Sequence, residues 1–447
     1  MESLSKNLVF ISVASLFFFS CSKDLNIRDT AAVAQSSLQP SDIAQLRTGT
    51  YSTVQNTSFS YYVDFDVRGQ NLAAGPGAVF INNLVMTPSA SDVQNLWQSA
   101  YICINNINFL IASISALPSS TQLSGYLGEA LFFRALNYYN LVTRWGGVPI
   151  VLTNTYAAIQ RSAEADVWNQ IKADLTASRA LIPAYSSNYY VSDQAVKALM
   201  ARVYLATGDN TNAALYADSV INSGKFALAT DSTSYSSIFI TGATSKEIIL
   251  AFANNNSGST NLLYGLANDT KATWTYSPFD SAYNNLYLNS VSPVIKSGDV
   301  RKSAVFTADK TRSIKYSNGK AGQELVAASS PTAEPIVMFR LSEMYLIAAE
   351  AQGATAGAST LSTFMAMRYK TPPAAAAISS LSPTQYQTLI LDERHREFYE
   401  EGQWWYDVKR TNRTDFFYGF NGQNYLLYYP VPQSEIDIAG YAQNMGY

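Results

Sequence analysis

Residues 389–410 concentrate charge in a chain that is otherwise poor in it. Only 14% of the 447 residues are Asp, Glu, Lys or Arg, yet seven of the ten positions 392–401 are Asp, Glu or Arg, and the single histidine, His395, stands among them. Strong helix formers dominate the run, and neither Gly nor Pro interrupts it before Gly402. We therefore predict a highly charged helix that ends at Gly402, followed by a bulky aromatic cluster at 404–406.

Two interpretations of this helix remain open. In the first, it is an amphipathic helix whose charges face solvent. In the second, it is half-buried and its ion pairs tie neighbouring helices together, because a buried charge is costly unless it has a partner. Arg396 and Glu400 stand four apart, so we expect them to form one such ion pair on the helix itself.

The composition narrows the classes of protein to which the chain can belong. Hydrophobic residues make up 47% of it, enough for a large core, and the length alone allows two or three domains. The net charge is −3 and Lys and Arg form no cluster, which argues against nucleic-acid binding. Tyr is in excess, with 30 residues against 21 Phe, and suits contacts with carbohydrate or peptide, or half-exposed seams between helices.

The sequence offers little catalytic or metal-binding chemistry. A single His rules out a zinc site of the HExxH type, and GxSxG, Walker and GxGxxG motifs are absent. The two cysteines form no disulfide framework, and Cys103 is expected to be buried inside a helix. Asp64 and Asp66 have the spacing of one side of a strand and could form a glycosidase pair, whereas the carboxylates of residues 389–410 stand beside arginines. We expect no catalytic residue, cofactor or metal.

Residues 1–20 have the features of an export signal. Lys6 supplies a positive charge, and residues 8–19 are apolar but too few to span a bilayer as a helix. The segment ends in Phe-Phe-Phe-Ser-Cys and resembles a bacterial lipobox, in which Cys21 becomes the acylated first residue of the mature protein. Phe18 stands where such signals usually have Leu. The alternative is an ordinary secretory signal with an incidental Cys.

Beyond the signal, we expect one mainly helical domain. Residues 21–40 are polar and rich in Ala and Ser, and we expect them to be a lipidated tether to a single domain at 41–447. No later stretch of about 18 residues is continuously apolar, so no other segment is expected to cross a membrane. Periodicity, caps and breakers predict helices that begin at Ser41 and Asp92, helices over 123–144, 163–181 and 192–208, a helix from Asn210, and helices over 335–352 and 358–369.

The helix over 192–208 and the one that starts at Asn210 form a predicted hairpin of about 33 residues. Ser192 is placed to cap the first helix, small residues line it, and Gly208 ends it. The hairpin resembles a tetratricopeptide-type unit, and we expect a second such pair from the helices over 335–352 and 358–369.

Two segments lack helical periodicity, and we expect them to carry the function. Residues 64–83 are rich in Gly and Asn, and residues 227–333 form a long insert with a strand-like run at 247–253. Sugars present C–H faces to aromatic rings and hydroxyls to Asn, Asp and Arg. We hypothesise that both segments line one ligand-binding surface; the alternative is that their side chains only pack the loops. The candidate residues are Asp64, Asp66, Arg68, Gln70, Asn71, Phe80, Asn82 and Asn83 in the first segment and Trp274, Tyr276, Tyr283 and Tyr287 in the second.

Taken in order, stretches of residues 21–447 resemble the SusD/RagB family of outer-membrane nutrient-binding lipoproteins of Bacteroidota. Each stretch is degenerate alone, and their order makes them specific. Two positions depart from the usual pattern, His395 in a run where Arg is common and Met445 where Pro is common. The stretches are LWQSAYICINNINFLI, GEALFFRALNYYNLVTRWGGVPIV, AVKALMARVYLATGDNTNAALYADSVINSG, EIILAF, PIVMFRLSEMYLIAAEA, ILDERHREFYEEGQWWYDVKR and QNMGY.

The resemblance implies a mainly α fold of tetratricopeptide-like helix pairs with an irregular, loop-rich ligand-binding region. It implies a surface-exposed protein, lipid-anchored in the outer membrane, that binds a nutrient and delivers it to a SusC-like TonB-dependent transporter without catalysis. The nutrient is usually a glycan and in some members a peptide. The family's binding residues follow no fixed motif, so none is transferred by position. Two rival interpretations are a lipoprotein scaffold that binds only proteins and a helical glycoside hydrolase.

Overall fold

The computed structural model describes residues 38–75, 78, 84–155, 157–239, 245–254, 276–288, 292–316, 334–417 and 419–447. The chain divides into two units, Met1–Leu38 and Gln39–Tyr447, and the described residues fall almost wholly in the second. Some residues singled out in the sequence lie outside the described residues, namely Cys21, Phe80, Asn82, Asn83 and Trp274.

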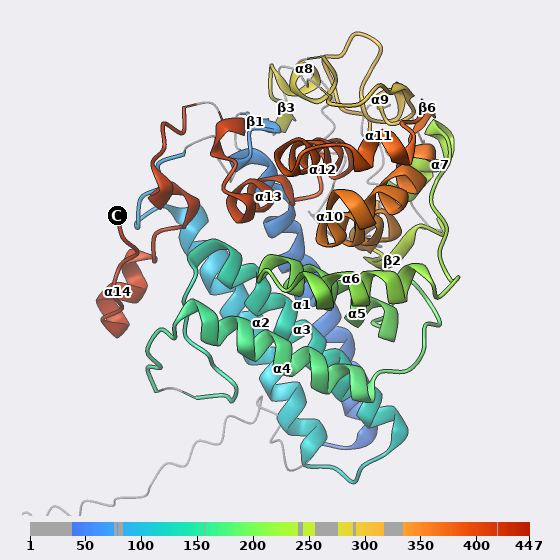
Figure 1. Ribbon diagram of the computed structural model, residues 1–447. Coiled ribbons are helices and arrows are strands. Elements are labelled where there is room, and N and C mark those ends of the chain that lie inside the picture. Colours follow the sequence, from blue (N-terminus) through green and yellow to red (C-terminus); the bar gives the residue numbers. More distant parts are fainter. Residues whose placement is uncertain are drawn as a thin grey trace, which may run out of the picture. The chain divides into compact units, whose positions relative to one another are not determined.

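The first part of the second unit is an array of helices in which each packs against the next along the chain (Figure 1). The mainly helical fold is as the sequence predicted. Within the described residues, no helix is both long enough and apolar enough to cross a membrane. The helices of the array are α1 (Pro40–Arg68), α2 (Ser91–Ser115), α3 (Thr121–Trp145), α4 (Glu164–Leu181), α5 (Asp193–Ala206) and α6 (Asn210–Ile221).

Helix α3 is the apolar centre of this array. The sequence predicted a helix over 123–144, and in the structure Phe132, Phe133 and Leu136 are each no more than 1% exposed. Contacts with α1, α2 and α4 cover it. Gly146 ends the helix with φ of +70°, a conformation that favours glycine.

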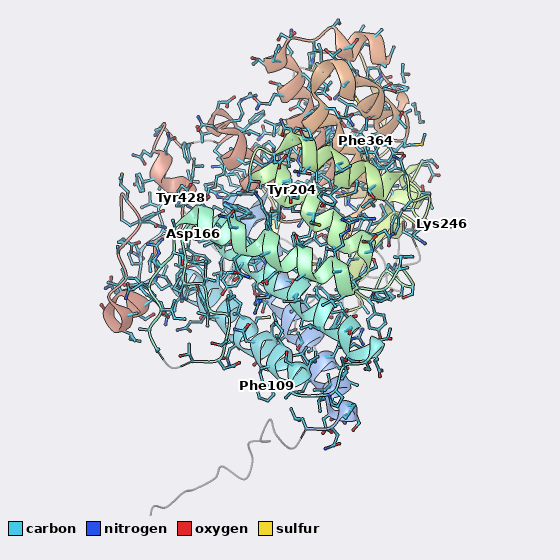
Figure 2. All side chains as sticks on the ribbon, turned by 60° about the horizontal axis from the view of Figure 1, so that its bottom comes forward. Phe109, Asp166, Tyr204, Lys246, Phe364 and Tyr428 are labelled. Carbon is cyan, nitrogen blue, oxygen red and sulfur yellow. The ribbon has the colours of Figure 1, made fainter. Side chains whose placement is uncertain are left out.

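The predicted hairpin of α5 and α6 is confirmed. The Ser192 hydroxyl accepts a hydrogen bond from the Ala195 amide and caps α5, and Gly208 turns the chain with φ of +74°. Across the hairpin, the ring of Tyr204 stacks on that of Tyr216, with centroids 5.5 Å apart. Figure 2 marks the position of Tyr204 on this hairpin. These two tyrosines fill a seam between helices, which is one of the two uses of Tyr that the composition suggested.

The expectation of an irregular segment from residue 64 is wrong at its start, because α1 continues to Arg68. Asp64 and Asp66 therefore stand on a helix and not on one side of a strand. The last turns of α1 bury Val63, Phe65 and Val67, so tertiary packing sustains the helix until Gly69. Two residues apart on a helix, the carboxylates point in different directions, which removes the proposed glycosidase pair.

The second predicted helix pair is only partly correct. Residues 336–340 form a strand, β5 (Ile336–Arg340), because they pair antiparallel with β2 (Ile248–Phe252), which the sequence had predicted as a strand. The chain then enters α10 (Leu341–Ala366), which bends at Gly353, where φ is +72°. The helical parts of α10 on either side of this glycine are the predicted pair.

The charged stretch forms two helices and not one. Helix α12 (Pro383–Glu397) begins earlier than predicted and ends before Gly402, and α13 (Trp404–Thr411) follows. Between them Glu400 has φ of +60°, and its amide and that of Gly402 donate to the Asp66 carboxylate, which holds the reversal in place. Since Glu400 lies outside the helix, the expected Arg396–Glu400 pair is not formed; Arg396 pairs with Asp392 and Glu393 instead.

Short elements complete the fold. Within residues 227–333, where the sequence indicated no helical periodicity, the described residues form only short helices and strands. Beside α12, Figure 1 shows β1, β3 and α8 near one another. The short elements are β1 (Leu72–Ala74), α7 (Ser232–Ser236), η2 (Ser237–Phe239), β3 (Tyr276–Pro278), α8 (Ala282–Tyr287), β4 (Ser297–Asp299), α9 (Lys302–Val305), β6 (Tyr369–Thr371), α11 (Ala375–Ser379), η4 (Thr414–Phe416), η5 (Asn424–Leu427) and α14 (Gln433–Ala439).

Candidate functional site

A two-stranded sheet joins the two segments that the sequence singled out. Strand β1 pairs antiparallel with β3, so that Leu72 faces Pro278 and Ala74 faces Tyr276. The Phe279 amide also donates to the carbonyl oxygen of Asn71 at 2.9 Å. Residues about 200 positions apart in the sequence therefore lie side by side, and α8 follows directly from this sheet.

Asp64 and Arg68, two of the candidate residues, are buried among aromatic rings below this sheet. The Asp64 carboxylate accepts hydrogen bonds from Arg144 Nε and the Tyr429 hydroxyl, each at 2.7 Å. The Arg68 guanidinium lies 4.4 Å from the ring of Trp405 and 4.6 Å from that of Tyr429, and donates to a backbone carbonyl. Both side chains are at most 2% exposed, so they serve the packing of α1.

Asp66, Asn71 and His395 form a buried chain of hydrogen bonds. Asn71 Nδ2 donates to Asp66 at 2.7 Å, and Asn71 Oδ1 lies 2.6 Å from His395 Nε2. The amide orientation makes Nε2 of His395 the donor, and the ring stacks on Trp404 with centroids 3.7 Å apart. Burial raises the pKa of Asp66 to about 7 and lowers that of His395 to about 3, so His395 is neutral.

Among the described candidates, Tyr283 and Tyr287 of α8 keep part of their surface open, whereas Tyr276 is 6% exposed. Their ring centroids are 5.3 Å apart, and both rings pack edge-on against Phe306. The ammonium group of Lys302 lies 5.6 Å from the centre of each tyrosine ring. Gln70 takes a left-handed conformation, with φ of +60°, in the turn that leaves α1.

An open cavity of about 380 Å³ lies beside Tyr287. This volume falls within the range of about 300–1,000 Å³ that is typical of small-molecule sites. The sequence did not single out most of its walls, because β4, α9, β6 and α12 meet only in the folded chain. Its polar and aromatic walls include Tyr287, Lys296, Ser297, Asp299, Lys302, Tyr369 and Arg396.

A buried ionic network, centred on α12, supports this cavity from within. Arg301 bonds to Glu393 at 2.8 Å and to Glu397 at 2.9 Å, and Arg340 and Arg368 bond to Glu397 from two other elements. Each of these five side chains is at most 1% exposed. The structure thus favours the ion-pair interpretation of the charged helix, and residues 392–397 are buried except for His395, which is partly exposed.

Burial and neighbouring charges shift the pKa values of several carboxylates and arginines in this network. Burial alone would raise the pKa of Glu397, but Arg368, Arg340 and Arg301 outweigh it and hold the pKa well below its usual value. The sequence did not indicate this network, because its three arginines come from segments that are far apart in the chain. Their convergence depends on the fold.

The described residues contain no group of three or more His, Cys, Asp or Glu side chains that could hold a metal ion. Cys103 is buried within α2, as predicted, and burial raises the pKa of its thiol to about 12. Its side chain therefore serves the packing of α2.

Comparison with known protein families shows the family to which this chain belongs. The model described as "SusD family" matches residues 152–425, more than half of the chain. The chain belongs to the SusD family. A second SusD-like model, described as "Starch-binding associating with outer membrane", matches residues 28–205. The description of this second model names association with the outer membrane, which agrees with the resemblance seen in the sequence, and it names starch as a ligand of that family.

Curated relatives come from Formosa agariphila. SusD-like protein P38 is 26% identical over 381 residues, which are 74% of this chain and 74% of that protein. SusD-like protein P2 is 30% identical over a shorter stretch of 149 residues, covering 32% of this chain and 30% of that protein.

Solved structures share the fold. A SusD superfamily protein from Bacteroides thetaiotaomicron superposes with a TM-score of 0.76 at 22% identity, covering 91% of this chain and all of that one. A laminarin-binding SusD-like protein superposes with a TM-score of 0.69 at 20% identity, covering 90% of this chain and 99% of that one. At these identities the likeness establishes the mainly α fold.

Proposed function

We propose that this SusD-family protein is a cell-surface lipoprotein that binds an oligosaccharide and delivers it to a SusC-like TonB-dependent transporter. Cys21 would carry the lipid that anchors it in the outer membrane. The observation that carries the proposal is the half-exposed pair Tyr283 and Tyr287 beside an open cavity. Family membership and the fold shared with a laminarin-binding protein support a glycan as the ligand class.

The tyrosine pair has the properties that a sugar requires. Each ring offers an apolar face for the C–H groups of a pyranose and a hydroxyl for its polar edge. Contacts with Phe306, at centroid distances of 5.4 Å and 6.1 Å, hold both rings before any ligand arrives. Binding therefore orders few additional rotatable bonds, and less of the contact energy is lost to entropy.

The candidates divide into two roles in this proposal. Those buried by their own hydrogen bonds or packing support the surface from below, namely Asp64, Asp66, Arg68, Asn71 and Tyr276. The remaining candidates would contact the ligand: Tyr283 and Tyr287 on α8, and, from the sequence pattern, Phe80, Asn82, Asn83 and Trp274.

Calorimetric titration of the chain without residues 1–20 with laminarin oligosaccharides tests this proposal. We expect Tyr283→Ala to weaken binding about tenfold, or about 1.4 kcal/mol, because it removes a stacking face. Trp274→Ala is expected to act in the same direction. Tyr185→Ala is the matched control, since Tyr185 is also a half-buried tyrosine packed edge-on against a phenylalanine, Phe226, with centroids 5.0 Å apart.

If Tyr185→Ala weakens binding as much as Tyr283→Ala, α8 is not the binding surface. Binding of peptides, with no oligosaccharide bound, would instead indicate the peptide-binding class of the family.

Purification from outer membranes tests the second half of the proposal. The full chain should co-purify with a barrel transporter and carry lipid, and Cys21→Ala should release it from the membrane fraction. Co-purification of the transporter without binding of any soluble ligand would favour the protein-only scaffold, and a wild-type chain recovered without lipid would remove the anchor.

A further inference from the structure

The cavity beside Tyr287 has a charge balance that a neutral sugar does not need. Its walls carry three cationic side chains, Lys296, Lys302 and Arg396, against one carboxylate, Asp299. The Asp299 carboxylate is already paired with the buried Arg301, through two hydrogen bonds of 2.9 Å and 2.7 Å. The open volume therefore faces an excess of positive charge.

Carboxylates behind the wall pair with Lys296 and Arg396 but not with Lys302: Glu393 bonds to the first two, and Asp392 also pairs with Arg396, at 3.8 Å. Glu393 is shared among three cations, Lys296, Arg301 and Arg396. Lys302 has no ion-pair partner among the described residues, and its ammonium group lies over the rings of Tyr283 and Tyr287 instead. A cation held at an open cavity without a carboxylate partner can bind an anionic group of a ligand.

A second observation points to a ligand at the same place. The hydroxyl oxygen of Tyr287 is buried and has no hydrogen-bond partner among the described residues, although Tyr287 is part of the cavity wall. Buried polar groups without partners are rare in native proteins and call for an explanation. At the rim, Ile295 is 91% exposed, which leaves an apolar side chain available for the C–H face of a sugar ring.

We infer that this cavity binds an acidic sugar unit, with its carboxylate or sulfate against Lys302. The inference rests on the proposed oligosaccharide binding and deepens it by stating the class of glycan. The ring of Tyr287 stacks on the sugar, and its hydroxyl gains the partner that it lacks. Since Lys296 and Arg396 are already tied to Glu393, they add a positive field while Lys302 makes the direct contact.

The test compares matched pairs of probes that differ only in charge. One pair is tetragalacturonate and the same tetramer with its carboxylates methyl-esterified; the other is sulfated and unsulfated laminaritetraose. We expect the acidic member of at least one pair to bind about tenfold more tightly than the neutral member. A preference for the galacturonate would indicate a carboxylate ligand, and a preference for the sulfated laminaritetraose would indicate a sulfate. The preference should shrink as salt is added, because part of the cavity is open to solvent.

Lys302→Met should remove this preference, so that the ratio of the affinities for the acidic and neutral members falls to about one. Lys310→Met is the matched control, because Lys310 also lies over Tyr283, at 4.9 Å, but is not part of the cavity wall. Acetylation of lysines, followed by mass spectrometry, gives a second measurement: the acidic probe should protect Lys302 and leave Lys310 reactive.

Tyr287→Phe separates a binding role from a structural one. Removing a hydroxyl without a partner should leave the free energy of unfolding unchanged, yet weaken binding of the acidic probe several-fold. A loss of stability with unchanged binding would assign the hydroxyl to the fold and count against the inference.

Equal affinity for both members of each pair overturns the inference, as does an equal effect of Lys302→Met and Lys310→Met. In those cases the proposed oligosaccharide binding still stands, because neutral probes bind. If none of the four probes binds, the inference falls, and the laminarin titration described above decides the proposed function separately.

Discussion

Helices α3 and α12 are both buried, but they are held in opposite ways. The middle of α3 is covered by apolar side chains, with Phe132 and Leu136 at most 1% exposed. The end of α12 is held by ion pairs, with Glu393 and Glu397 fully buried against arginines from three other segments.

The difference follows from what surrounds each helix. Regular neighbours, α1, α2 and α4, offer α3 long apolar faces, so its apolar side chains pack by non-directional burial, and Arg134 and Arg144 add buried ion pairs with Asp174 and Asp64. Helix α12 packs apolar residues such as Leu389 and Ile390 against α10, but its charged end meets α8, α13 and segments next to short strands. Directional bonds from Arg301, Arg340 and Arg368 hold such pieces in one arrangement, at the energetic cost of burying charge.

The largest effect is expected from removing the central charge of the ionic network. Glu397→Gln leaves Arg340 and Arg368 without a full counter-charge, and we expect the free energy of unfolding to fall by about 3–5 kcal/mol. Urea denaturation followed by circular dichroism measures this change, and it should persist in high salt because the network excludes solvent.

Leu136→Ala is the apolar counterpart, with an expected loss of about 2–5 kcal/mol from the cavity it leaves in α3. A cost below 1 kcal/mol for Glu397→Gln, beside a normal cost for Leu136→Ala, would contradict the structural role of the network.

An intermediate effect is expected from pH at the turn between α12 and α13. Burial raises the pKa of Glu400 from 4.5 to about 8; Ser313 and Lys315 oppose the rise, while Asp66 and Glu401 add to it. The folded protein keeps this proton up to about pH 8, whereas the unfolded chain releases it near 4.5. Stability from this group is therefore present at low pH and is lost as pH rises through this range.

Glu400→Gln carries no charge and should remove that dependence. We expect the difference in unfolding free energy, variant minus wild type, to grow between pH 5 and 8 by at most about 1.4 kcal/mol per pH unit. His395 and Lys409, whose pKa values burial lowers to about 3 and about 7, contribute to both proteins and cancel in the difference. Asp66, whose pKa burial raises to about 7, is coupled to Glu400, so the same comparison is made in Asp66→Asn, which removes its titration. A difference that stays constant with pH would show that Glu400 is ionised in the fold.

The smallest effect is expected at an exposed ion pair of the same part of the chain. Arg413 bonds to Asp415 at 2.9 Å, but the Asp415 side chain is 61% exposed. Asp415→Asn should change the free energy of unfolding by about 0.5 kcal/mol or less, and high salt should remove the change. If Asp415→Asn lowered the free energy of unfolding as much as Glu397→Gln does, burial would not determine how much an ion pair contributes to stability.

Much of the fold follows from local patterns. The Ser192 cap, the Gly208 turn and the apolar α3 are short-range features, and each forms as predicted because the residues that cause it are neighbours in the chain. The errors lie where tertiary contacts override local signals. Helix α1 continues to Arg68 because its last turns are buried, and residues 336–340 form a strand because β2 lies beside them.

The candidate site was harder to predict for the same reason. The sequence indicated the two segments and Tyr287. It also predicted that Asp64 and Asp66 contact the ligand, whereas the fold buries both side chains. Lys296 and Lys302 carried no signal, because the cavity that they line exists only where β4, α9 and α12 meet.

The sequence by itself determined three features: the helical repeats, the need of the charged residues in 392–401 for oppositely charged partners when buried, and the family to which the chain belongs. These depend on residue order and on spacings of three, four or seven residues, which act within one element. Tertiary structure decided which arginines form ion pairs with Glu393 and Glu397, where α12 ends, and which side chains line the cavity. Those outcomes depend on pairings across tens to hundreds of residues, whose free energy exists only when the whole unit is folded.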